Sequence, residues 1–219
     1  MVTLRAGLVG NLVGTLGATI FPPLFLLIGQ AGGRSRELRE FPLYMYLGMS
    51  AFMLAILAMG SGNMNFIETL RKVDTTKPLP FAPQKVVGYE VLSKALLPMA
   101  FSIVPFVIGF AIRPSAWTFH VTGLLLGPPL VLMVMAVMFL VAILFPDFED
   151  PTQRGFRGMI MLLATACAIV PVFLFPAGAV LLGQPPIYGV PLSLPIAAGI
   201  ASLTLLWSGR LYSDYNPSE

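Results

Sequence analysis

Long apolar stretches alternate with shorter polar stretches along the whole chain. An α-helix needs about 20 largely apolar residues to cross a bilayer. Stretches of about this length lie at roughly residues 6–29, 43–62, 95–112, 120–145, 158–182 and 191–211. The pattern therefore predicts an all-α polytopic membrane protein with about six transmembrane helices in a single transmembrane domain, residues 1–219. The last two stretches are separated by an uncharged Gly/Pro-rich link, residues 183–189, which could instead be a re-entrant segment.

The composition agrees with a membrane protein. Hydrophobic residues make up 57% of the chain and charged residues 11%, and the mean hydropathy is +0.85, far outside the range of soluble domains. The lipid bilayer is thus the first expected partner. The formal net charge of +3 is explained by basic cytoplasmic loops, and we expect no nucleic-acid partner. The single cysteine, Cys167, excludes an intrachain disulfide.

The distribution of Lys and Arg predicts an orientation. With six spans, one side carries Arg5, Arg71, Lys72, Lys77, Lys85, Lys94, Arg154, Arg157 and Arg210. The other side carries only Arg34, Arg36, Arg39 and Arg113. Because cytoplasmic loops are enriched in basic residues, both termini are expected in the cytoplasm. If the first stretch does not span, the basic loop at residues 34–40 would be cytoplasmic instead.

The main polar segment is the loop at residues 63–94. Eight of the 23 charged residues of the chain lie between Glu68 and Lys94. Prolines between Lys77 and Pro83 favour an extended segment followed by a helix start. We expect a helix over residues 84–94 that lies at the interface before the third span, and another over residues 63–73. From the residues alone, an ordinary charged loop is the favoured interpretation of this pattern.

A second polar loop covers residues 145–157. It holds an acidic cluster, Asp147, Glu149 and Asp150, followed by two basic residues, Arg154 and Arg157. Carboxylates of this kind can hold a divalent metal, but they also suit the N-terminal end of a helix, where negative charge is favourable. We favour the helix start, and we expect neither a metal nor a cofactor.

Within the spans, small residues and prolines predict close packing and bends. Gly7, Gly10, Gly14 and Gly17 recur on one helix face, which permits close approach of another helix from this chain or from a second chain. Prolines at 22–23, 128–129 and 176 interrupt backbone hydrogen bonding within or beside spans.

Residues for catalysis are scarce. The only histidine, His120, follows Trp117 at the edge of a span, so we expect it in the interfacial aromatic belt, and no zinc-binding pair exists. No charged residue lies at the centre of a predicted span, and no Gly-x-x-x-x-Gly-Lys-[Ser/Thr] motif is present. The chain is therefore expected not to be an enzyme, and energy for any transport would come from a partner.

Both polar loops resemble those of ABC-2 type permeases. Residues 68–92, ETLRKVDTTKPLPFAPQKVVGYEVL, look like the family's segment between spans two and three, with a Leu-Pro stretch before a basic residue and a Val-Val pair. Residues 145–157, which contain FPDFEDP, are similar to the family's ATPase-facing loop between spans four and five. The family usually has an amphipathic helix before the first span and a helical hairpin between spans five and six. Here five residues and a short link stand in their places.

The resemblance implies the membrane subunit of an ATP-driven exporter in a bacterial or archaeal cell membrane. Its partners would be a separate P-loop ATPase subunit and a second permease copy or homologue. The ATPase-coupling loop would comprise Glu68, Arg71, Lys72, Asp74, Lys77, Pro78, Leu79, Pro80, Lys85 and Glu90. The chain would be a minimal member of the family or the C-terminal part of a longer permease.

Two other classes of function stay open. One is an intramembrane lipid-modifying enzyme with a carboxylate-bound metal, for which the candidate ligands are Asn63, Asn65, Asp74, Asp147 and Asp150. The other is a membrane assembly protein that transports nothing.

Overall fold

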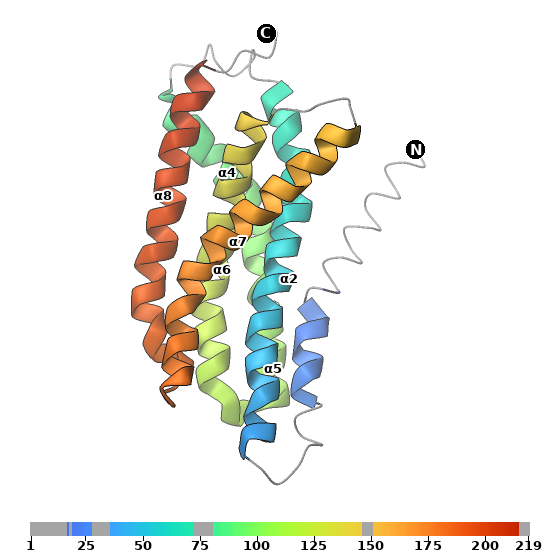
Figure 1. Ribbon diagram of the computed structural model, residues 1–219, viewed down its shortest axis with the longest axis vertical. Coiled ribbons are helices and arrows are strands. Elements are labelled where there is room, and N and C mark those ends of the chain that lie inside the picture. The colour runs from blue at the N-terminus through green and yellow to red at the C-terminus, as the bar shows by residue number, and fades with distance from the viewer. Residues whose placement is uncertain (1–16, 18, 28–35, 72–80, 146–150, 215–219) are drawn as a thin grey trace.

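The computed structural model describes residues 17, 19–27, 36–71, 81–145 and 151–214, all as helices and short links without a strand in these ranges. After a helix at residues 19–27 come α2 (Arg36–Arg71), α4 (Pro83–Phe101), α5 (Val104–Ile112), η1 (Pro114–Ala116), α6 (Trp117–Leu144), α7 (Pro151–Leu181), η2 (Pro186–Gly189) and α8 (Val190–Asp214). The long helices run roughly along one axis, and α7 crosses the face of the bundle obliquely (Figure 1).

Four helical segments have the length and apolarity needed to cross a membrane. They are Pro83–Ile112, Pro114–Leu144, Gly155–Leu181 and Pro186–Asp214. They correspond to the third to sixth predicted spans, so the prediction of an integral membrane protein with an all-α fold is confirmed. The apolar part of α2, Leu43–Ala58, is shorter. The first predicted span lies partly outside the described residues. Six spans therefore stay a prediction.

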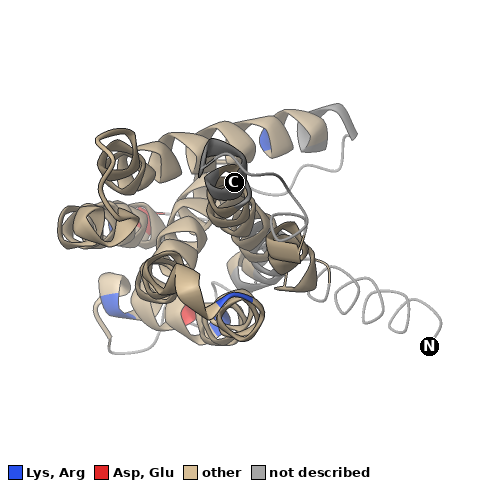
Figure 2. Cartoon of the chain, turned by 90° about the horizontal axis from the view of Figure 1, so that it is seen from below, with Lys and Arg blue, Asp and Glu red and all other residues tan. Residues whose placement is uncertain are grey.

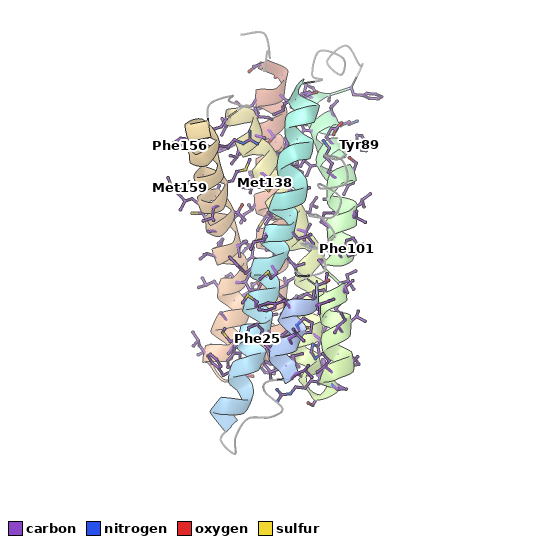
Figure 3. All side chains as sticks on the ribbon, turned by 90° about the vertical axis from the view of Figure 1, so that its right-hand side faces the viewer. Phe25, Tyr89, Phe101, Met138, Phe156 and Met159 are labelled. Carbon is purple, nitrogen blue, oxygen red and sulfur yellow. The ribbon has the colours of Figure 1, made fainter. Side chains whose placement is uncertain are left out.

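The central helix of the bundle is α6. In its most apolar window 67% of the residues are buried in protein, against 22% in the corresponding window of α7. Met133, Met135, Met138 and Phe139 are all fully buried there. The outer helices instead direct large apolar side chains outward, as Tyr89 on α4 and Phe156 and Met159 on α7 illustrate (Figure 3). Because lipid tails are as apolar as these side chains, such a surface suits a bilayer.

Exposed aromatic residues near both ends of the bundle suggest where the bilayer interfaces lie. Trp117 and Tyr188 are exposed at one end, and Tyr89 and Trp207 are exposed toward the other. Along α8, the rise from Val190 to Trp207 is about 26 Å at 1.5 Å per residue. This length is close to the roughly 30 Å of a bilayer's hydrocarbon core, where Trp and Tyr collect at the borders.

Two predicted helix boundaries were wrong. The stretch predicted as a separate helix over residues 63–73 is the continuation of α2, which runs for 36 residues up to Arg71. The predicted interfacial helix over residues 84–94 is the first part of α4, which starts at Pro83 and continues into the span. Polar residues end the contact with lipid but do not end a helix, whose hydrogen bonds are internal. The helix start at Pro83 is confirmed.

The ends of the helices form two groups. At one end α2, α6 and α8 finish and α4 and α7 begin; we call it the charged end (Figure 1). At the opposite end α2 begins, α5 meets α6 through η1, and α7 meets α8 through η2. Seen from below, most of the described ribbon carries neither acidic nor basic residues (Figure 2).

Candidate functional site: the charged end of the bundle

Lys94 carries its charge into the bundle between α2, α4 and α6. Its Nζ lies 3.1 Å from Oε2 of Glu90, one turn earlier on α4, and 5.1 Å from the centre of the Phe66 ring on α2. Phe66 is fully buried and packs edge-to-face on Phe139 of α6, with 5.0 Å between ring centres. The Lys94 side chain is 18% exposed. An ammonium held by a carboxylate and an aromatic face is compatible with this depth, about 16 Å from the start of α4.

Arg157 is also buried at the charged end. It belongs to the second turn of α7 and is 5% exposed. Its neighbour Phe156 is exposed and packs edge-to-face on Phe145, with 6.3 Å between ring centres. A buried guanidinium requires acceptors inside the protein. Arg157 therefore points into the bundle, where it would hold the start of α7 in place rather than present its charge to a partner.

The start of α4 is joined to the end of α8. A Cβ added to Gly209 would lie 2.7 Å from the Cα of Gln84, so the two backbones approach each other more closely than any larger residue would permit. Tyr212, one turn beyond Gly209, is buried. On the outer faces of the same helix ends, Lys85 and Arg210 are both exposed.

The charges in the first turn of α4 are unfavourable for the stability of the helix. It contains no acidic residue, no side chain caps its N-terminus, and Lys85 lies at its third position. The N-terminus of a helix carries a partial positive charge, so a lysine there is unfavourable and an acid would be stabilising. The helix end, Lys85 and the nearby Arg210 together present a positive surface, which favours an acidic partner or anionic lipid headgroups.

The structure brings together only part of the predicted coupling residues. Lys85 and Glu90 lie on α4, and Glu68, Arg71 and Arg154 lie on helices whose side chains are not described at these positions. The following predicted residues lie outside the described ranges: Lys72, Asp74, Lys77, Pro78, Leu79, Pro80, Asp147, Glu149, Asp150, Gly7, Gly10 and Gly14. Gly17 is exposed, and a Cβ added to it would meet nothing within 4 Å.

A buried polar cluster at the opposite end corrects the prediction for His120. Instead of facing the interface, His120 is fully buried, and its Nε2 lies 2.9 Å from the carbonyl oxygen of Arg113. A carbonyl only accepts, so Nε2 carries the proton, and in the neutral ring Nδ1 is left as an acceptor. The Tyr46 hydroxyl lies 3.2 Å from this Nδ1 and 3.2 Å from the carbonyl oxygen of Pro105. The cluster therefore ties α2, α5 and α6 together.

Gly109 of α5 makes room for this cluster. A Cβ added there would overlap the Tyr46 hydroxyl and come within 3.0 Å of Cε1 of His120. Among the described side chains, no three of the types His, Cys, Asp and Glu come together as a metal site would need. The cluster is thus a structural tie in the described part of the chain.

Comparison with known proteins adds no assignment: no protein-family model matches the chain, and no curated protein or solved structure matches it significantly.

Proposed function

We propose that this chain is the membrane subunit of an ATP-driven exporter of the ABC-2 type, energised by a separate P-loop ATPase. The observation that supports this proposal is the positive surface at the charged end, where Lys85 in an uncapped first turn lies near Arg210. A second copy or homologue of the chain would complete the transport path.

The packing around this surface suits the transmission of a movement. α4 is one continuous helix from Pro83 to Phe101, so a displacement at its start is carried into the membrane. Gly209 couples the same helix to α8, and the contact of Lys94 with Phe66 couples it to α2. Closure of two ATPase subunits would displace these helix ends and open a path between two permease copies.

The orientation is part of the proposal. The charged end would face the cytoplasm, since the helices place six basic residues toward it (Arg71, Lys85, Lys94, Arg154, Arg157 and Arg210) and three toward the opposite end (Arg36, Arg39 and Arg113) in the described residues. A cytoplasmic ATPase would then meet the positive surface directly.

The test is site-specific photocrosslinking in native membranes. A photoreactive residue is placed at Lys85 or Arg210, and matched controls place it at Trp117 or Tyr188, which are exposed at the opposite end. We expect the charged-end positions, and not the controls, to form an adduct with a protein whose sequence contains a Walker A motif. The purified chain should also change the ATP hydrolysis rate of that protein.

Other outcomes separate the rival functions. Adducts with lipid alone, together with lipid turnover that chelators abolish, would support the lipid-modifying enzyme. A stable protein adduct without any ATPase would support an assembly protein. Either result would overturn the exporter proposal.

A further inference from the structure

The third span is broken between α4 and α5, at Ser102 and Ile103. The Ile103 N–H bonds the Ala100 carbonyl, three residues back, at 3.3 Å, instead of the Met99 carbonyl four residues back. The Ser102 hydroxyl donates to that Met99 carbonyl at 2.7 Å. Pro105 has no N–H for the Phe101 carbonyl. A tightened turn with missing backbone donors inside a membrane helix is a typical hinge.

The helix opposite this break is weakened at the same level. Gly127 of α6 faces Ser102, and a Cβ added to it would lie 3.1 Å from the Ser102 Oγ. Pro128 and Pro129 follow directly and lack the N–H groups that would bond the carbonyls of Leu124 and Leu125. At this level, both helices therefore lack an unbroken series of backbone hydrogen bonds that would resist bending.

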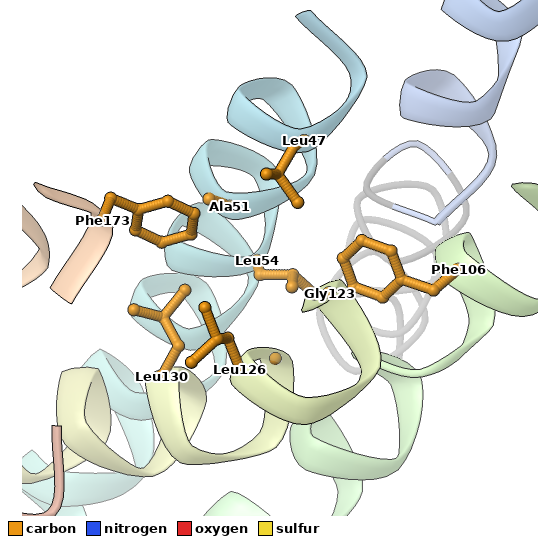
Figure 4. Close-up of a pocket in the computed structure, with 9 residues that line it drawn as sticks. Leu47, Ala51, Leu54, Phe106, Gly123, Leu126, Leu130 and Phe173 are labelled. Atoms are coloured by element: carbon orange, nitrogen blue, oxygen red, sulfur yellow. The ribbon is translucent and has the colours of Figure 1, made fainter. Parts of the chain in front are cut away.

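An apolar cavity adjoins the break (Figure 4). It is small, with room for about one water molecule, and is lined on α6 by Gly123 and Gly127, on α5 by Phe106, and on α7 by Phe173. Leucines and an alanine of α2 and α6 complete the lining. The pocket marks a small gap in the packing beside the Phe106 ring, which lies directly over Gly123.

Both halves of the span pack on α6, and α4 also packs on α2 and α8, but the contacts at their far ends differ. α5 is held to α2 and α6 by Tyr46, which contacts both Pro105 and His120. The start of α4 is held to α8 by the close approach of Gly209 to Gln84. A bend at Ser102 would therefore move α4 without breaking the cluster at the opposite end.

We propose that the third span is a hinged helix, in which α4 swings against a fixed α5 about Ser102 and Ile103. The hinge lies near mid-depth of the bilayer, since Trp117 to Gly127 spans about 15 Å along α6, half of a hydrocarbon core of about 30 Å. Discontinuous helices at this depth line the pathways of several transporter folds. The hinge is a property of this chain alone and goes beyond the proposed partnership with an ATPase.

The experiment measures distances between paired spin labels in lipid nanodiscs, without an ATPase. On a Cys167→Ala background, one pair replaces Leu92 and Val107, both exposed and fifteen residues apart across the break. The control pair replaces Gly155 and Val170, also fifteen residues apart, within α7. A Cβ at Gly155 meets nothing within 4 Å, and Val170 is exposed.

A straight helix separates either pair by about 22 Å. We expect a single narrow population for the control pair and an additional, shorter population for the pair across the break. Pro105→Ala restores an N–H for the Phe101 carbonyl and should shift the population back toward about 22 Å. Equally narrow distributions for both wild-type pairs would overturn the hinge, and this comparison holds even if the Pro105→Ala variant does not fold.

Discussion

Among the places where prolines interrupt helices of the bundle, the breaks at Pro176 of α7 and between α4 and α5 differ in how neighbouring groups bond the carbonyls that lose their donors. In α7, Pro176 leaves the Val172 carbonyl without its helix donor, and Ser193 of α8 donates to that carbonyl at 2.6 Å. Between α4 and α5, the Ser102 hydroxyl donates to the Met99 carbonyl of its own helix, and the Tyr46 hydroxyl of α2 donates to the Pro105 carbonyl on the α5 side. The carbonyl freed in α7 is thus bonded by another helix, whereas the Met99 carbonyl at the second break is bonded by its own helix.

Packing reinforces this difference. Beside Pro176, Gly189 lies so close that a Cβ added to it would overlap backbone atoms of Phe175 and Pro176. At the second break, a small apolar pocket adjoins Phe106 and Gly127. A proline in a membrane helix therefore gives no hinge by itself. A cross-helix hydrogen bond to the freed carbonyl and close backbone packing lock it, and a break without them is able to bend.

The largest expected effect on stability is at the break in α7, beside Pro176. Gly189→Ala forces a methyl group into the backbone of Phe175 and Pro176, which cannot rotate away. We expect a loss of about 3 kcal/mol or more, measured as reduced unfolding free energy in detergent micelles. The matched control is Gly199→Ala in the following helix, α8, where a Cβ meets nothing within 4 Å. Equal stability of the two variants would refute the close backbone contact.

A smaller effect is expected from removing the cross-helix donor. Ser193→Ala leaves the Val172 carbonyl unsatisfied in an apolar environment and also removes the hydroxyl from the Gly189 carbonyl, 3.1 Å away. We expect a loss of about 1–2 kcal/mol in the same assay. Ser193→Thr keeps a hydroxyl and should retain part of the stability. If alanine were neutral, the break in α7 would not depend on α8.

Gly123→Ala tests whether the packing around α5 can adjust. A Cβ there overlaps the Phe106 ring, which is a side chain, whereas a Cβ at Gly189 overlaps backbone atoms. We expect a loss of about 1 kcal/mol, smaller than for Gly189→Ala, because a side chain can reorient more easily than backbone can move. Gly123→Ala with Phe106→Leu should recover the loss. A cost as large as that of Gly189→Ala would show that the region around α5 is rigid.

The helical spans were predictable because lipid imposes a simple rule: each crossing must be long, apolar and hydrogen-bonded internally. The face of a helix on which a given residue lies was not predictable. His120 follows Trp117 at the edge of a span, yet the Trp is exposed and the His is buried against Tyr46. Neighbours in sequence point to different faces of a helix, and a single sequence does not say which helix covers which face.

The charged end was predictable in composition but not in contacts. Helices were predicted over residues 63–73 and 84–94 from the proline position and side-chain spacing, and the described residues of both stretches are helical, although they continue α2 and α4. The approach of Gly209 to Gln84 and the contact of Lys94 with Phe66 join residues far apart in the sequence. The sequence did hold one indication of the contact beside Pro176. This proline leaves the Val172 carbonyl without a donor, and Ser193 on the following helix can supply one.

The smallest expected effect is at the hinge itself. Ser102→Ala removes a hydroxyl whose bond to Met99 lies within its own helix, so the local backbone can readjust to satisfy that carbonyl. We expect a loss of about 0.5 kcal/mol, near the lower limit for a hydrogen bond in a membrane protein. The same variant should nevertheless increase the shorter population in the Leu92–Val107 distance measurement, because the bond opposes bending. The substitution would then change the unfolding free energy little but the distance distribution clearly, as expected where the bond at a break lies within a single helix.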